Sequence, residues 1–154
     1  MPSPDSSSAR ASLRCLLAGQ SLAVLSTCGD GHPYASLVGF AHDATLSRLF
    51  FATARGTRKF ANLRDCPHAA LLVDSRRHRA EDFQEASAVT AVGPVRELRD
   101  GERAAAATTF LARHPQLADF LGGDDCALLG MDVASYLLVA RFQEVTEIRP
   151  PVAP

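Results

Sequence analysis

The sequence predicts one mainly β domain of the α+β class, an antiparallel barrel flanked by short helices. Its 154 residues suffice for one hydrophobic core and leave little room for a second domain. Six or seven short apolar segments follow one another, separated by turn residues or short helical patterns. Long helices between the strands would instead favour a parallel sheet. The pattern is therefore typical of a closed antiparallel barrel.

The N-terminal region is expected to contain one helix. Residues 1–8 are rich in Pro and Ser and are predicted to be a disordered segment ahead of the domain. Leu13, Leu16 and Leu17 recur at helical spacing, so the helix should run over residues 9–19. Three strands should follow this helix, the first two joined by the tight turn Gly29–Gly31, in which an Asp-Gly pair is typical of antiparallel hairpins. The expected strands cover residues 21–28, 33–43 and 49–54.

The rest of the chain alternates short strands with polar segments. A short helix should begin at Thr57, Gly93-Pro94 should bend a long strand, and Asp100 should cap a later helix. The expected elements are a helix at 57–63, strands at 69–75 and 86–98, a charged exposed loop at 75–86, a helix at 101–114 and two final strands within 126–148 that meet near Asp132. We expect the domain to span residues 9–149, followed by a Pro-rich tail at 150–154.

Composition and charge exclude several classes of function. The net charge of −1 argues against nucleic acid or an anionic membrane as the main partner, because both favour basic surfaces. No apolar run approaches the ~20 residues of a membrane helix. The first ten residues lack the basic head and apolar centre of a secretion signal, so we expect the chain in the cytoplasm. Trp is absent, which excludes a site built on Trp stacking.

The cysteines indicate neither a disulfide framework nor a metal site. None is part of a CxxC pair, and no His stands at a ligand-like spacing from any of them. Isolated cysteines in a cytosolic chain are mostly small buried hydrophobes, and we expect this role for all four, Cys15, Cys28, Cys66 and Cys126.

The segment FATARGTRKFANL, residues 51–63, carries the strongest candidate site. A strand leads through a Gly-containing turn into a helix start, where unpaired N–H groups and the positive end of the helix dipole favour an anion. Thr57 offers a hydroxyl donor, Arg58 a bidentate fork and Lys59 a point charge, with Arg55 close by in sequence. These residues predict a phosphate site. A capped amphipathic helix with solvated charges explains them equally well.

The segment GHPYASLVGF, residues 31–40, is the second candidate. Small residues at Ala35, Ser36 and Gly39 would let a flat ligand approach the backbone, although close strand packing also uses small side chains. No other segment carries recognisable chemistry, because the sequence contains no GxSxG turn, no GxxxxGKS loop and no GxGxxG motif. We therefore name no catalytic side chain.

The order of these segments resembles the pyridoxamine 5′-phosphate oxidase-like FMN-binding split barrels. The matching parts are SLAVLSTC, GHPYASLV, FFATARGTRKFANL with the following PHAALLV, the run FLARHPQLADFL and the closing LVARFQEVTEI. The FLARHP run is most similar to the haem-utilisation branch of that family. The resemblance covers residues 13–148 and implies a split, Greek-key type antiparallel barrel that forms a homodimer, with FMN at the subunit interface and a small organic substrate.

Transferred position by position, the resemblance also implies which residues bind the cofactor. The strand that begins at Ser36 would lie along the isoalloxazine ring, two residues of the next strand would sit near the ring and ribityl chain, and the helix start would bind the phosphate. The implied set is Ser36, Leu37, Val38, Gly39, Ala52, Thr53, Thr57, Arg58 and Lys59.

This chain departs from the vitamin B6 oxidases of the family at several positions. Those enzymes have Arg where this chain has Ser36, and an Arg-Gln pair where it has Ser87 and Ala88. Their C-terminal Trp and R-x-H motif have no counterpart, so vitamin B6 oxidation is not expected. Three alternatives to an FMN oxidoreductase stay open: a haem-binding or haem-degrading protein of the same fold, a non-enzymatic flavin-binding module, and deazaflavin F420 in place of FMN.

Overall fold

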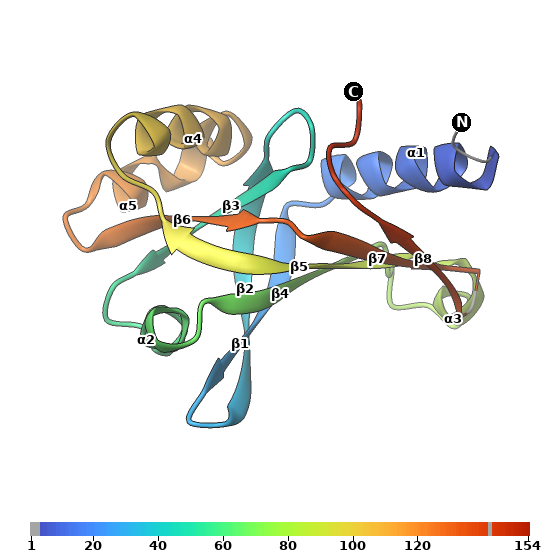
Figure 1. Cartoon of the computed structure of the whole chain (residues 1–154), viewed down its shortest axis with the longest axis horizontal. Coiled ribbons are helices and arrows are strands. Elements are labelled where there is room, and N and C mark those ends of the chain that lie inside the picture. The colour runs from blue at the N-terminus through green and yellow to red at the C-terminus, as the bar shows by residue number, and fades with distance from the viewer. Residues whose placement is uncertain (1–3, 142) are drawn as a thin grey trace.

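The computed structural model describes residues 4–141 and 143–154, and strands dominate it (Figure 1). The strands are β1 (Leu22–Gly29), β2 (His32–His42), β3 (Arg48–Ala54), β4 (His68–Asp74), β5 (Ala88–Glu97), β6 (Cys126–Asp132), β7 (Ser135–Ala140) and β8 (Glu144–Ile148). The helices are α1 (Pro4–Gly19), α2 (Arg58–Asp65), α3 (Asp82–Glu85), α4 (Asp100–Arg113) and α5 (Ala118–Gly122), with a 3₁₀ turn, η1 (Pro115–Leu117).

Six of these strands close into an antiparallel barrel in the order β4-β1-β2-β3-β6-β5, with β5 pairing back onto β4. Strands β7 and β8 extend the sheet from β5. The expected fold class, a mainly β split barrel with short flanking helices, is confirmed. β5 can serve both neighbours because it changes partner at Gly93-Pro94: residues 88–92 pair with β7 and residues 95–97 with β6. A Cβ at Gly93 would lie 2.1 Å from the carbonyl oxygen of Asp132, so glycine is required at this bend.

Two hydrophobic clusters hold the barrel together. The larger fills the interior with inward-facing side chains such as Leu25, Phe40 and Leu71, and α1 adds Leu13 and Leu17. The smaller packs α4 and α5 against the outside of β2, β3 and β6, and includes Ala41, Phe50, Phe110, Leu121 and Leu128. Along β1 and β5 buried and more exposed positions alternate, the pattern of a sheet with one covered face, whereas β6, which α5 covers from outside, is buried at six consecutive residues.

The β1–β2 hairpin turn is the one that the sequence predicts. Asp30 and Gly31 both have positive φ, 51° and 74°, which is the backbone of a two-residue type I′ turn. The C-terminal region differs from the prediction, because a third strand, β8, follows the two expected ones. Arg141 and Gln143 adopt positive φ, and the chain then pairs residues 144–148 with β7.

Two helix starts and three cysteines differ from expectation. α1 begins at Pro4, so residues 4–8 are helical rather than disordered, and residues 1–3 of that segment lie outside the described residues. Proline suits a first helical turn because its missing N–H is not needed there. Asp100 is the first residue of α4 and not its cap; Arg99 holds the cap position without a side-chain cap bond. Cys15 is exposed on α1, Cys28 and Cys66 are partly exposed, and Cys126 alone of the four is buried as expected.

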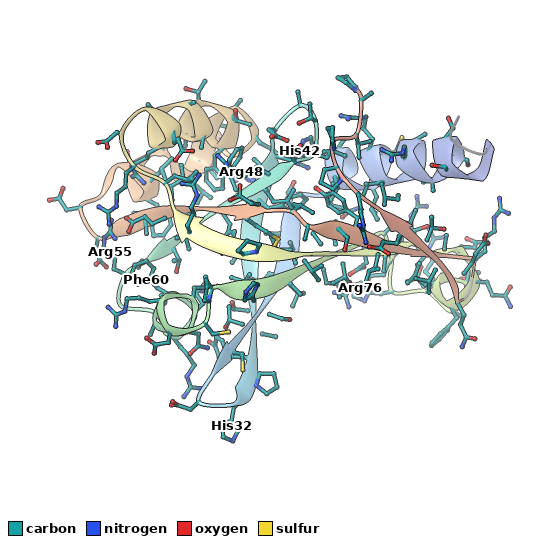
Figure 2. All side chains as sticks on the ribbon, in the orientation of Figure 1. His32, His42, Arg48, Arg55, Phe60 and Arg76 are labelled. Carbon is teal, nitrogen blue, oxygen red and sulfur yellow. The ribbon has the colours of Figure 1, made fainter. Side chains whose placement is uncertain are left out.

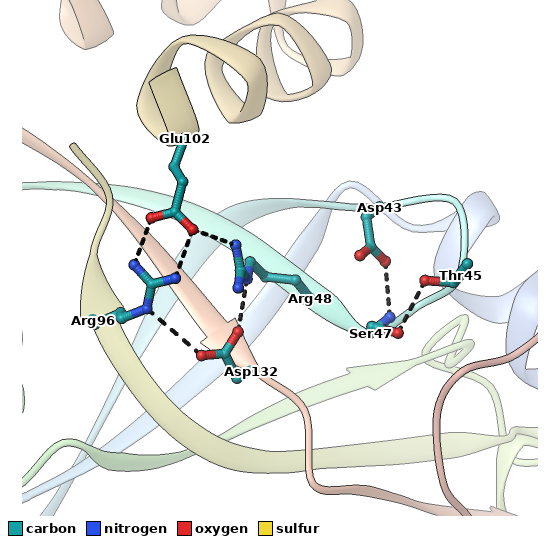
Figure 3. Close-up of polar contacts among 7 residues, drawn as sticks. All are labelled: Asp43, Thr45, Ser47, Arg48, Arg96, Glu102 and Asp132. Carbon is teal, nitrogen blue, oxygen red and sulfur yellow. Dashed lines mark hydrogen bonds and ion pairs between the residues drawn. The ribbon is translucent and has the colours of Figure 1, made fainter. Parts of the chain in front are cut away.

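Four charged side chains join α4 to the barrel (Figure 3). Glu102 of α4 accepts hydrogen bonds from Arg96 on β5, at 2.7 and 2.8 Å, and from Arg48 on β3, at 3.2 Å. Asp132 at the end of β6 pairs with the same two arginines, at 2.7 Å to Arg48 and 3.7 Å to Arg96. The two carboxylates and two guanidinium groups thus form one closed network.

Among the described residues, no helix is long and apolar enough to span a membrane.

Candidate functional site

The barrel is split between β2 and β3, and this split is the candidate site. The two strands pair only through Phe40, Ala41 and His42 on β2, opposite residues 49–51 on β3. Residues 32–39 of β2 continue to pair with β1 on their other edge, and residues 52–54 of β3 continue to pair with β6. The two strand segments therefore diverge into a wedge that opens towards the start of α2.

Backbone groups of β2 face this wedge. In an antiparallel strand, alternate residues direct their N–H and C=O groups to opposite neighbours. The N–H of Phe40 donates to the carbonyl oxygen of Ser21, on the β1 side. Leu37 has the opposite parity, so its N–H and C=O point towards the β3 side, beyond the last paired residues. A flat polar ligand in the wedge would find strand hydrogen-bonding groups there.

The four predicted β2 residues lie on two different faces of the strand. Val38 is 6% exposed and belongs to the barrel core, whereas Leu37 is 63% exposed on the outside. A Cβ on Gly39 would lie 3.4 Å from the ring of His114, so that position is covered by the end of α4. The side chain of Val38 thus packs in the core, and Leu37 is the residue of the four whose side chain points outward and is accessible.

Ser36 provides an unusual polar atom beside the wedge. Its hydroxyl oxygen is buried and makes no hydrogen bond within the part of the chain that the structure describes. An unsatisfied buried hydroxyl costs about 1–3 kcal/mol, so native structures keep such atoms mainly where something else supplies a partner. This observation makes Ser36 the β2 side chain best suited to contact a ligand.

The predicted α2 residue Thr57 is engaged in the turn that starts the helix. Its hydroxyl accepts from the N–H of Phe60, at 3.4 Å, and donates to the carbonyl of Ala54, at 2.9 Å. Thr53, buried to 3% exposure, adds a contact of 2.8 Å between the two threonine hydroxyls. Thr57 is therefore the N-cap of α2, and its hydroxyl already has partners within the turn. Thr53 supports this cap, and Ala52 packs at the edge of the outer cluster.

Arg58 and Lys59 are the available cations at this helix start. The guanidinium carbon of Arg58 lies 5.3 Å from the ring centre of Tyr34 on β2, so it reaches the same hairpin that borders the wedge. Neither Arg58 nor Lys59 forms an ion pair with any residue in the described ranges. In contrast, Arg55 forms a hydrogen-bonded ion pair with Glu97 at 2.5 Å. Its charge is therefore neutralised and does not add to the positive charge of Arg58 and Lys59. That hydrogen bond raises the pKa of Arg55 and lowers the pKa of Glu97.

A cavity of about 380 Å³ lies between the hairpin tip and α2. Its lining includes His32 at the tip (Figure 2), together with Tyr34, Arg58 and Asn62. Asn62 donates to the hydroxyl of Thr27 at 3.0 Å and fills the space in which a side chain at position 29 would stand. Sequence reasoning missed Tyr34 and Asn62, because no local spacing indicates that α2 packs on this hairpin.

The R-H-P run acts as a support behind β2. His114, 3% exposed, donates from Nε2 to the carbonyl oxygen of Phe40 at 2.7 Å. Arg113 places its guanidinium 4.8 Å from the ring centre of Phe40. The two side chains therefore hold β2 at the residue where it parts from β3. No group of three or more His, Cys, Asp or Glu side chains that could hold a metal ion occurs among the described residues.

The comparisons with known proteins agree with this architecture. The sequence matches the pyridoxamine 5′-phosphate oxidase family over residues 9–145, while no curated protein matches it. Similar solved structures include a haem-binding protein from Mycobacterium smegmatis, with TM-score 0.82, 18% identity and coverage of 97% of this chain and 59% of that one. ChuZ from Campylobacter jejuni has TM-score 0.78, 14% identity and coverage of 95% and 61%.

A third similar structure is the general stress protein 26 from Bacillus anthracis, with TM-score 0.70, 17% identity and coverage of 92% of this chain and 98% of that one. At these identities the structures show the shared fold. The present chain spans about three fifths of the length of the first two proteins and nearly all of the third. The family match covers most of the sequence, and the chain belongs to the pyridoxamine 5′-phosphate oxidase family.

Proposed function

We propose that this protein is an FMN-binding flavoprotein, an oxidoreductase for a small organic substrate, with the flavin held in the β2–β3 split at a homodimer interface. The observation that carries the proposal is the split itself. It exposes strand backbone groups beside a helix start whose two cations, Arg58 and Lys59, have no acidic partner among the described residues. A planar ring attached to a phosphate matches that combination.

The residues present fit such a cofactor. Arg58 and Lys59, with the free N–H groups of the first turn of α2, would hold the phosphate. The backbone of Leu37 would bond the edge of the ring, and the unpartnered hydroxyl of Ser36 would gain a polar contact. A bound flavin supplies the electron transfer, and this chain's residues orient it and exclude water.

The outer face of the sheet supports the homodimer. Strand register places Leu37, Val24, Leu72, Thr90 and Leu137 in one row across β2, β1, β4, β5 and β7. Leu37 and Leu137 are 63% and 37% exposed, and Leu22, beside this row, is 53% exposed. Leu22 and Leu37 lie on the neighbouring strands β1 and β2, and exposed apolar side chains grouped on one face of a sheet favour an interface. Because Leu37 ends the row at the wedge, a second copy on this face would lie against the split.

The visible spectrum and an FMN titration test the proposal. Purified protein should bind FMN, added in excess, with one flavin per chain and quenched flavin fluorescence. A flavin that nicotinamide donors reduce supports the oxidoreductase reading; a bound flavin that no such donor reduces indicates a flavin-binding module without catalysis. Preferential retention of F420 would replace FMN as the cofactor, and failure to bind any flavin would overturn the proposal.

Haem is the second candidate, because one similar structure, at TM-score 0.82, is described as a haem-binding protein. A haem titration separates the two ideas. A saturating Soret shift that disappears in a single His→Ala variant would favour haem, and His32, exposed at the border of the cavity beside α2, is the first position to change. Absence of a Soret shift, together with stoichiometric FMN binding, would exclude haem and support the flavin proposal.

A further inference from the structure

A second cavity, of about 350 Å³, lies on the other face of α2. Successive helix residues turn by about 100°, so Arg58 and Asn62 share one face while Phe60 and Arg64 lie on the opposite one. The second cavity is bounded by Phe60, Arg64, the end of β5 and the middle of β6. It is therefore separate from the split and from the cavity at the hairpin tip.

The floor of this second cavity is apolar. Leu63, Val95 and Leu129 lie beneath it and are 5%, 5% and 2% exposed. Phe60 and Pro67 form part of its sides. Such a surface favours the carbon skeleton of a ligand, because covering it removes apolar area from water.

The rim of the cavity carries an excess of positive charge. Glu97 is the local carboxylate, and it pairs with two arginines, Arg55 at 2.5 Å and Arg99 at 3.1 Å. Arg64, on α2, has no ion-pair partner in the described part of the chain. Arg64 and Arg99 line the cavity, Arg55 pairs Glu97 from outside the lining, and these three guanidinium groups are matched by the single carboxylate of Glu97. The fourth nearby arginine, Arg96, does not add to this excess, since Glu102 and Asp132 hold it in the network of Figure 3.

We propose that this cavity is a binding site for a small organic monoanion, a molecule with one carboxylate and an apolar body. The body would cover Leu63, Val95 and Leu129, and the carboxylate would reach Arg64 and Arg99 at the rim. Arg99 is free to respond, because its side chain is 73% exposed and Arg55 alone would still pair Glu97. The volume lies at the lower end of ligand pockets, roughly 300–1,000 Å³, which limits the ligand to a small one.

Octanoate and its neutral analogue 1-octanol test this site by calorimetry and by NMR of labelled Leu and Val methyl groups. The wild-type protein without flavin should bind octanoate saturably, with one site per chain and shifts at Leu63, Val95 and Leu129. Octanol should bind at least about tenfold more weakly, because the charge-assisted hydrogen bonds are missing. This experiment is independent of the flavin proposal, since neither the calorimetry nor the NMR measurement involves FMN.

The double variant Arg64→Gln/Arg99→Gln should lose at least about tenfold in octanoate affinity and leave octanol binding unchanged. Arg77→Gln, in the exposed loop before α3, is the matched control and should bind as the wild type does. The thermal midpoint of each variant verifies its fold. The proposal is overturned if octanoate does not saturate by about 5 mM, if octanol binds equally well, or if the shifted methyl groups lie elsewhere.

Discussion

Arg113 satisfies backbone carbonyl groups at the end of α1. The last carbonyls of a helix lack partners within that helix. Arg113 donates to the carbonyl oxygen of Leu17 at 2.6 Å and to that of Ala18 at 3.1 Å, and it also bonds Gln20. Its guanidinium stacks on Phe40. Burial lowers the pKa of Arg113, but arginine remains protonated at any physiological pH. One side chain therefore joins α1, α4 and β2.

Replacing this arginine should reveal its contribution. Arg113→Met keeps an apolar stem over Phe40 but leaves the carbonyls of α1 without a donor. We expect the free energy of unfolding to fall by about 2 kcal/mol, the usual range for hydrogen bonds to a charged group. Urea denaturation measures this loss. Arg77→Met, in the exposed loop, should change stability by less than about 0.5 kcal/mol; an equal loss in both variants would contradict the role of Arg113.

Arg58 and Lys59 are the residues through which the cofactor proposal is most directly tested. Arg58→Ala/Lys59→Ala removes both cations from the start of α2 and leaves the Thr57 cap in place. FMN affinity should fall by a few kcal/mol, or about 100-fold or more, because charge-assisted hydrogen bonds to the phosphate are lost. Riboflavin, which lacks the phosphate, should bind both proteins alike. Unchanged FMN affinity would show that the phosphate binds elsewhere.

At the scale of elements, α4 is attached to the barrel both by apolar contacts and by charge. Phe110 and Ala106 pack in the outer cluster, and Glu102 pairs with arginines of β3 and β5. The hydrogen bond from Arg96 lowers the pKa of Glu102 to about 2. Exposed ion pairs stabilise little when isolated, but a closed network with bidentate geometry is more effective. The end of α4 also supports β2 through His114, so this attachment bears on the split.

Glu102→Gln should lower the thermal midpoint, and the effect should depend on pH. The folded-state pKa of about 2 lies below the ordinary value of 4.5, so the carboxylate stabilises the fold fully above that value. This contribution is lost as the pH falls towards 2. The difference in midpoint between wild type and variant should therefore be constant from about pH 8 to 5 and shrink below about pH 4. Glu147→Gln, at the exposed pair with Arg149, is the control. A pH-independent difference would contradict this account.

At the scale of the whole molecule, the barrel uses its two sides differently. α4 and α5 cover the outside of β2, β3 and β6, whereas the row from Leu37 to Leu137 crosses five strands with exposed leucines at both ends. A homodimer would cover this second face. The same arrangement would let each copy contribute to the other's split, because the row ends beside it.

Leu22→Glu/Leu137→Glu should convert the proposed dimer to a monomer in sedimentation velocity, since two charges per copy would be buried in an apolar interface. FMN affinity should fall when the dimer dissociates, because the proposed flavin site lies at the dimer interface. Neither Leu22 nor Leu137 belongs to the predicted cofactor set. Phe83→Glu, at a 78% exposed position on α3, should leave the assembly unchanged. A wild-type protein that is monomeric at all concentrations would contradict the dimer.

Local patterns predicted most of the fold, because they depend on short-range physics. Short apolar segments predicted the first strands, Asp30-Gly31 predicted the tight turn, and Gly93-Pro94 predicted the bend at which β5 changes partner. Thr57 was correctly placed at the helix start. Its hydroxyl, which the sequence offers as a phosphate donor, already bonds the neighbouring Ala54 and Phe60 in the structure. The spacing of residues in the sequence does not show whether the Thr57 hydroxyl caps the helix or binds a ligand.

The sequence by itself determined the strands β1 to β7, the three longest helices α1, α2 and α4, the tight turn and the residue types at the candidate phosphate site. Only the tertiary structure decided which of these residues are available. It paired Arg55 with Glu97, set Arg58 against Tyr34, and left the hydroxyl of Ser36 buried without a partner among the described residues. These outcomes depend on contacts between segments 24 to 42 positions apart, such as Tyr34 with Arg58 and Arg55 with Glu97. Closure of the barrel creates those contacts, and no local periodicity encodes them.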